Sequence, residues 1–181
     1  MLINSYKSTV VSLAILCLLA GCTSRKHYAK KDYSFYSENF QLDSNSLLKT
    51  DGVYNNDKKM YKFYRSGQVN MVLSGTIELT NDADYAMAFN RGIREAAGVK
   101  KATLFEGYYH IKDNRMVMQF VNTATRQFYY TYVLLEKGKL TIVKSTHLGK
   151  GKIKDQHYQT SYKDVYRYLP KPAGGYLAPD W

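Results

Sequence analysis

Four histidines are the side chains best suited to chemistry in this 181-residue chain, and their spacing gives them no shared site. They are His27, His110, His147 and His157, and no two fit a metal-binding spacing such as His-Glu-x-x-His. His147 and His157 flank a lysine-rich stretch and could meet in the fold. We expect all four to be structural or solvated, with no bound metal and no other cofactor.

The familiar motifs of other catalytic chemistries are also missing from the sequence. The stretch Gly-Lys-Gly-Lys at 149–152 does not have the Gly-x₄-Gly-Lys-Ser/Thr spacing of a phosphate-binding loop. The Gly-x-Ser-x-Gly motif of many serine hydrolases does not occur. A carboxylate pair for glycoside cleavage would meet only in the folded chain, so a hydrolase stays open as an alternative. We expect a protein that is not an enzyme.

The two cysteines, Cys17 and Cys22, lie near the start of the chain, where the sequence has the three parts of an export signal. Lys7 gives the start a positive charge, residues 10–19 form an apolar run, and Ala20-Gly21 supplies small residues. The run is too short to cross a bilayer core of about 30 Å, which takes about 20 residues. It therefore predicts a removed signal peptide, residues 1–21, in place of a membrane span.

Leu19-Ala20-Gly21-Cys22 resembles the lipobox of bacterial lipoproteins. The resemblance implies that a diacylglycerol is attached to the Cys22 sulfur, that the chain is cut between Gly21 and Cys22, and that the new amino group is acylated. Two or more acyl chains anchor a protein stably, so the membrane is an expected partner. Thr23 in place of Asp after the cysteine implies the outer membrane. The alternative is an ordinary signal peptide with a chance cysteine.

Removing 21 of the 181 residues leaves 160, enough for one domain. Because Cys17 leaves with the signal and Cys22 carries lipid, we expect no disulfide in the mature protein. Residues 22–46 are polar and read as a tether after the lipidated cysteine, with a docked part expected around Phe35 to Leu42. Residues 47–169 form the expected β domain, and residues 170–181 are a Pro/Gly-rich tail.

Positive charge is concentrated late in the chain. The formal net charge of +11 falls to about +10 once Lys7 is removed. Residues 137–171 hold nine lysines and arginines against two aspartates, or +7. Such a surface attracts anionic envelope components; nucleic acid is not expected, because the chain is exported. Alternatively, the lysines only solubilise strand edges. The candidate anion patch is Lys150, Lys152 and Lys154.

The sequence from Leu47 onward predicts strands joined by tight turns. Residues 60–73 read as a hairpin with a three-residue loop, Arg65-Ser66-Gly67, whose glycine takes the left-handed position. That loop pairs Phe63 with Val69 and Tyr61 with Met71. Between the strands, residues 82–97 carry apolar side chains at intervals of four and predict one amphipathic helix.

A second hairpin is predicted at 105–121, with a two-residue turn at Asp113-Asn114. This turn places Tyr109 opposite Met118 and Gly107 opposite Phe120, so that apolar residues of both arms share one face. A third hairpin, 128–143, turns at Lys137-Gly138 with a register that is ambiguous by one residue. A last strand or strand pair follows within 156–169.

These elements predict a mainly β protein, an antiparallel up-and-down barrel or a sandwich of about seven to nine strands with one inserted helix near 82–97. Seven apolar residues share the expected interior face, either as plain core or as the lining of a ligand cavity. They are Tyr61, Phe63, Met71, Phe105, Tyr109, Met118 and Phe120.

The region 47–169 resembles the lipocalin-like, calycin-type barrels of small bacterial lipoproteins. The resemblance is carried by Gly52-Val53-Tyr54, where the family has Gly-x-Trp, and by residues 63–69, 107–120 and 132–142. It implies a barrel that holds a small apolar ligand. We therefore expect an outer-membrane lipoprotein that binds a small hydrophobic or amphipathic molecule. The alternative is an envelope interaction protein whose basic, tyrosine-rich surface binds a protein or an acidic glycan.

Overall fold

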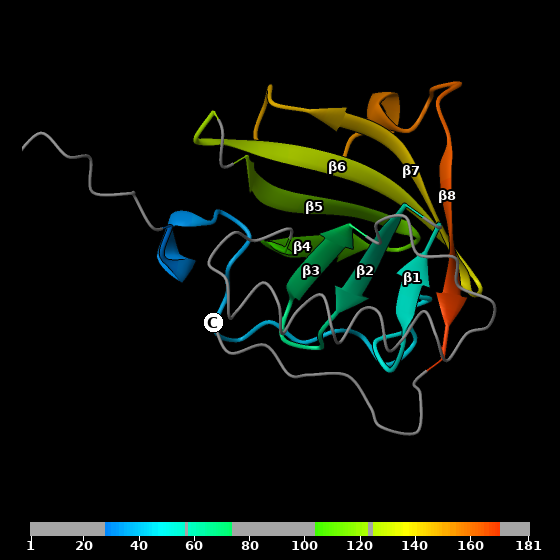
Figure 1. Cartoon of the computed structure of the whole chain (residues 1–181). Helices are drawn as coiled ribbons and strands as arrows, with labels where there is room; N and C mark the ends of the chain where they lie inside the picture. The colour runs from blue at the N-terminus through cyan, green and yellow to red at the C-terminus, as the bar shows by residue number, and fades with distance from the viewer. Residues whose placement is uncertain (1–27, 57, 74–103, 123–124, 171–181) are drawn as a thin grey trace, which may run out of the picture.

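The computed structural model describes residues 28–56, 58–73, 104–122 and 125–170, and within these ranges eight antiparallel strands close into a barrel (Figure 1). Each strand pairs with its neighbour in sequence, and the last returns to the first. The barrel, and not the sandwich, is the observed form. The strands are β1 (Val53–Asn55), β2 (Lys59–Phe63), β3 (Gln68–Leu73), β4 (Leu104–Lys112), β5 (Arg115–Asn122), β6 (Gln127–Glu136), β7 (Lys139–Thr146) and β8 (Asp164–Leu169).

Two short 3₁₀ turns accompany the strands, η1 (Lys30–Asp32) and η2 (Asp155–His157). None of the helical turns in the described ranges is long and apolar enough to cross a membrane. The helix predicted near 82–97 lies outside the described residues. So do the signal segment with Gly21 and Cys22, and residues 171–181 of the tail.

The first two predicted hairpins have the predicted registers. Phe63 pairs with Val69 and Tyr61 with Met71 across β2 and β3, while Gly67 takes a φ of 84° in the loop between them. Across β4 and β5, Tyr109 pairs with Met118. Turn chemistry and alternation agree in both hairpins, and this agreement determines the register.

The third hairpin turns at Lys137-Gly138, as predicted, and its register changes by one residue along the strands. Leu135 lies opposite Leu140 near the turn, and the pairing shifts by one residue at an irregularity between Tyr132 and Val133. A β-bulge of this kind places two residues of one strand against one of the other. The ambiguity in the sequence therefore reflects a real change of register along β6 and β7.

The barrel closes where β1 meets β8, and Gly52 makes that approach possible. Val53 pairs with Leu169 and Tyr54 with Tyr168. A Cβ atom at position 52 would lie 2.0 Å from the carbonyl oxygen of Leu169, so only glycine fits. β1 begins only at Val53, although the alternation predicts a strand from Leu47. Before Gly52 the described chain packs against the interior cluster through Leu48 and does not pair with a neighbouring strand.

The two ends of the barrel differ. One end, here called the turn end, holds the β2–β3, β4–β5 and β6–β7 hairpin turns; the loop end holds the β1–β2, β5–β6 and β7–β8 connections. Residues 40–48 cover the turn end: Leu42 and Leu48 are buried in the interior cluster and Phe40 packs against it. The Lys49 amide also donates a 3.0 Å hydrogen bond to the Tyr54 hydroxyl.

The outer face of β4–β6 is covered as well, by the start of the described chain. The ring of Tyr33 lies 4.9 Å from that of Tyr108, and the Phe35 amide donates to the Gln119 side-chain oxygen over 3.1 Å. The segment 22–46 was expected to be a tether with a docked part around Phe35 to Leu42. The docked part is longer, because residues from Tyr28 onward also contact the barrel. Together with Ile153 and Tyr158, which follow β7 in the chain, this segment covers the outer face of β5, so that β5 is buried on both faces.

Candidate functional site

All seven residues predicted for the interior face lie in one core cluster or pack against it. Six are buried and Phe105 is half-buried against them. The shared face follows from strand alternation, because every second side chain of a closed sheet points inward. The cluster members predicted from sequence are Tyr61, Phe63, Met71, Tyr109, Met118 and Phe120, and Phe105 packs against them.

Near the turn end, aromatic rings fill the interior against one another. The ring of Phe63 lies 5.7 Å from Tyr54 and 5.4 Å from Tyr109, both edge to face, an arrangement that stabilises aromatic pairs. The Phe40 ring adds a 5.2 Å contact to Tyr109 from the covering segment. Phe63 and Tyr109 therefore act as core in this half of the barrel.

At the loop end the interior presents apolar side chains that are only partly covered. Phe105, opposite Met71 on the neighbouring strand, is half-buried, and so is Tyr129. The Tyr129 ring stacks on Phe120 at 5.6 Å with an interplanar angle of 22°. Solvent thus reaches aromatic surface that is continuous with the buried core, which is the usual lining of a small-molecule site.

Next to this surface lies a group of polar side chains, here called the polar network, made by Tyr61, Tyr166, Asp164 and Asn56. The Tyr166 hydroxyl donates to Asp164 Oδ2 over 2.7 Å, and the Asn56 amide donates to Asp164 Oδ1 over 2.7 Å. The ring of Tyr61 meets that of Tyr166 edge to face at 5.0 Å. The network belongs to the loop end, where β1 ends and β8 begins.

Burial determines the protonation of these hydroxyls. It raises the pKa of Tyr61 above its ordinary value, and that of Tyr166 further, because Tyr61 and the Asp164 carboxylate lie beside it. Burial also raises the pKa of Tyr129 to about 12. All three phenols are therefore neutral at physiological pH. As neutral phenols they are poorly suited to act as nucleophiles, and the Tyr166 proton is already donated to Asp164.

Sequence analysis missed Tyr129, Asp164, Tyr166 and Asn56. Alternation along β8 was the available signal for two of them, since Asp164 and Tyr166 lie two residues apart on one face. Asn56 follows a three-residue strand, and no periodicity marks its role.

The Gly-Lys-Gly-Lys stretch lies on the outside of the barrel, and its conformation is fixed by the packing of Gly151. Lys150, Lys152 and Lys154 are exposed, whereas Gly151 is buried and Ile153 is half-buried. Gly151 has a φ of 65°, and a Cβ atom there would lie 2.5 Å from the rings of Phe35 and Tyr130. The candidate anion patch is therefore separate from the barrel interior.

The histidines within the described residues contact different partners. The ring of His147 lies 5.8 Å from Tyr129, and His110 lies 6.2 Å from Phe35. His157 Nδ1 is 3.1 Å from Lys144 Nζ. In the described part of the chain no group of three or more histidines, cysteines or acids could hold a metal ion.

Comparison of the chain with protein-family models, curated proteins and solved structures finds no match.

Proposed function

We propose that this protein is a lipid-anchored lipoprotein of the bacterial cell envelope whose barrel binds a small amphipathic ligand at the loop end. One observation carries the proposal: half-buried Phe105 and Tyr129 lie at the loop end of an interior that residues 40–48 cover at the other end. A barrel of eight strands has room for one small ligand beside its own side chains.

The chemistry of the loop end indicates the kind of ligand. An apolar portion would lie against Phe105 and Tyr129, where it removes half-buried aromatic surface from water. A polar portion would meet the half-buried members of the polar network, the Asp164 carboxylate and the Asn56 side-chain amide. This combination favours an amphipathic molecule over a plain hydrocarbon. The proposed function includes no covalent step.

The membrane anchor of the proposal rests on the lipobox resemblance. Cys22→Ser should abolish labelling of the protein by a radioactive fatty acid, because the lipidated sulfur is removed. Labelling that persists in this variant would overturn the lipid-anchor assignment, and with it the proposed place in the outer membrane.

Ligand binding is tested by native mass spectrometry of residues 23–181, which include every described contact. We expect an adduct of constant mass, released on denaturation. Phe105→Glu should remove the adduct, because it places a charge in the apolar surface. His110→Glu is the matched control, on the same strand but on the exposed outer face. An adduct that survives Phe105→Glu, or is lost equally in both variants, contradicts the proposed site.

A further inference from the structure

The connection between β7 and β8, residues 147–163, exposes large apolar side chains near both of its ends. Leu148 is 81% exposed and Tyr162 is 57% exposed. Figure 1 shows this connection beside β7, along the outside of the barrel. A single exposed apolar residue needs no explanation. Here, however, the two flank a stretch that holds four lysines.

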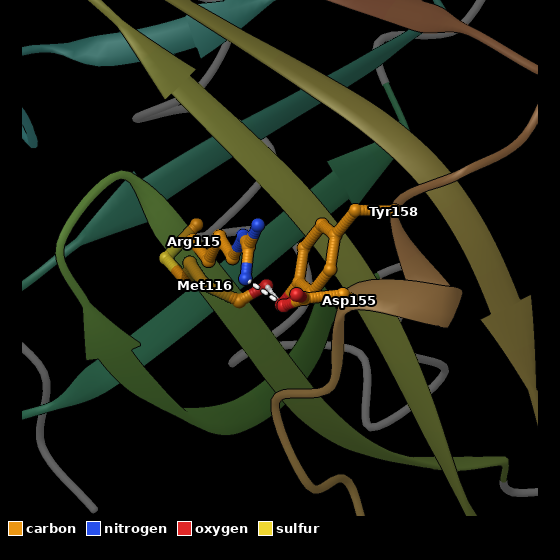
Figure 2. Close-up of polar contacts among 4 residues, drawn as sticks. All are labelled: Arg115, Met116, Asp155 and Tyr158. Carbon is orange, nitrogen blue, oxygen red and sulfur yellow. Dashed lines mark hydrogen bonds and ion pairs between the residues drawn. The ribbon is translucent and has the colours of Figure 1, made fainter.

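The charge of this connection is positive and unopposed. It contains Lys150, Lys152, Lys154 and Lys163 against Asp155, which leaves +3 with neutral histidines. Asp155 is already paired with Arg115 of β5 (Figure 2). In the described ranges, Lys150, Lys152 and Lys154 have no acidic partner within ion-pair distance. Their charges therefore face solvent.

The barrel holds the connection in place, so that its lysines share one side. The Tyr158 hydroxyl donates to the Met116 carbonyl oxygen over 3.3 Å, and the Arg115 guanidinium lies 5.2 Å from the centre of the Tyr158 ring (Figure 2). Gly151 and Ile153 pack inward. Gly151 and Ile153 alternate with the lysines and face the outer wall of the barrel. The lysines at 150, 152 and 154 therefore all face solvent on the same side.

We propose that the β7–β8 connection docks on a bilayer that contains anionic phospholipid. The lysines would pair with lipid phosphates, while Leu148 and Tyr162 enter the headgroup region. Basic residues beside exposed apolar and aromatic ones are the usual combination for binding at a membrane interface. This goes beyond ligand binding in the barrel, because it gives the anchored domain a defined orientation with the β7–β8 side toward the lipid.

The electrostatic part is tested by flotation of residues 23–181 with vesicles of one part phosphatidylglycerol to two parts phosphatidylcholine, and with phosphatidylcholine alone. We expect binding to the anionic vesicles only. Neutralising Lys150, Lys152 and Lys154 to Gln together should weaken it by about fivefold for each lysine. The matched control removes three charges from the turn end: Arg65→Gln, Lys112→Gln and Lys137→Gln. Equal losses in both triple variants would overturn the proposal.

Insertion is tested separately, with a reporter at the apolar tip. Leu148→Trp in a Trp181→Phe background should shift its fluorescence to the blue on anionic vesicles, because the indole leaves water. Leu148→Ser should weaken binding, whereas Leu47→Ser, at an exposed leucine before β1, should not. No blue shift would overturn the proposal. So would dextran sulfate binding as tightly as the vesicles with no effect of Leu148→Ser, which would assign the lysines to an acidic polymer.

The vesicle assays and the ligand assay test separate claims, and either claim can be contradicted without the other. Phe105→Glu should leave vesicle binding unchanged, because Phe105 lies in the interior cluster. The lysine triple variant should retain the mass-spectrometric adduct. Vesicle binding lost through Phe105→Glu would contradict the assignment of docking to the β7–β8 connection.

Discussion

At the scale of single residues, glycine at position 151 allows a close approach that no other residue type permits. Gly151 brings the backbone of the β7–β8 connection against Phe35 and Tyr130 in a left-handed conformation. Gly149 has a φ of 92° but faces open space. Substitution at Gly149 therefore tests only the strain of a positive φ. Substitution at Gly151 tests that strain together with the steric clash.

Gly151→Ala should lower the free energy of unfolding by about 2–4 kcal/mol, because it adds overpacking to the strain of a positive φ. Gly149→Ala should lower it by only about 1 kcal/mol, from the strain alone. Urea denaturation followed by circular dichroism measures both. Equal losses in the two variants would show that packing against Phe35 and Tyr130 is not what requires the glycine.

The polar network makes a prediction about affinity. Tyr166→Phe removes the hydroxyl that holds Asp164 in the polar network. The carboxylate is then less well positioned for a ligand, and binding should weaken by about three- to tenfold, the value of one hydrogen bond. Tyr168→Phe is the control on the same strand, since its hydroxyl bonds to Asp51 near the turn end. Titration with a dansylated fatty acid compares them. If Tyr168→Phe weakens binding as much, the polar network has no special role.

His157 makes a prediction about pH. Loss of hydration lowers its pKa, and Lys144 and Lys154 lower it further. The folded state therefore binds its proton less readily than the unfolded state, whose pKa is about 6.5. The unfolding free energy should fall as the pH drops through and below that value.

In His157→Gln this loss should be smaller, and the two proteins should differ by a constant amount above about pH 7. Denaturation midpoints measured between neutral and mildly acidic pH provide the comparison. Parallel curves throughout this range would contradict a lowered pKa for His157.

At the scale of elements, the chain before β1 closes one end of the barrel and covers part of its outside. Leu48 lies in the interior cluster, 4% exposed, whereas its neighbour Leu47 is 42% exposed. Leu48→Ala should therefore cost about 2–5 kcal/mol of unfolding free energy through the cavity it leaves. Leu47→Ala should change it by less than about 0.5 kcal/mol. Thermal and urea unfolding of the two variants measures both changes. If Leu48→Ala also had a small effect, residues 40–48 would not be tightly packed on the barrel.

The hairpins were predictable from sequence because their information is local. Gly67 and Asp113 lie in turns whose lengths determine the pairing of the flanking strands. For residues 28–48 the sequence indicated only a docked part around Phe35 to Leu42, and not the partners that these residues contact. Tyr33 and Phe35 meet partners more than seventy residues away in sequence, and no periodicity in their polar segment marks those contacts.

At the scale of the whole molecule, the barrel is polarised. Its turn end is covered, its loop end presents partly exposed aromatic surface beside the polar network, and its β7–β8 side carries the lysines. The candidate site also combines residues with a local sequence signal and residues brought together only by long-range contacts. Alternation identified the seven apolar lining residues, but Asp164 and Asn56 meet only because β8 returns to β1.

The central claim is that the loop end of the interior binds an amphipathic molecule, and the most direct measurement is fluorescence titration of residues 23–181 with a dansylated fatty acid. We predict saturation at one probe per barrel with emission shifted to the blue, weakened at least about tenfold by Phe105→Glu and unchanged by His110→Glu. Binding that does not saturate, or that is indifferent to Phe105→Glu, would contradict a ligand site in this barrel.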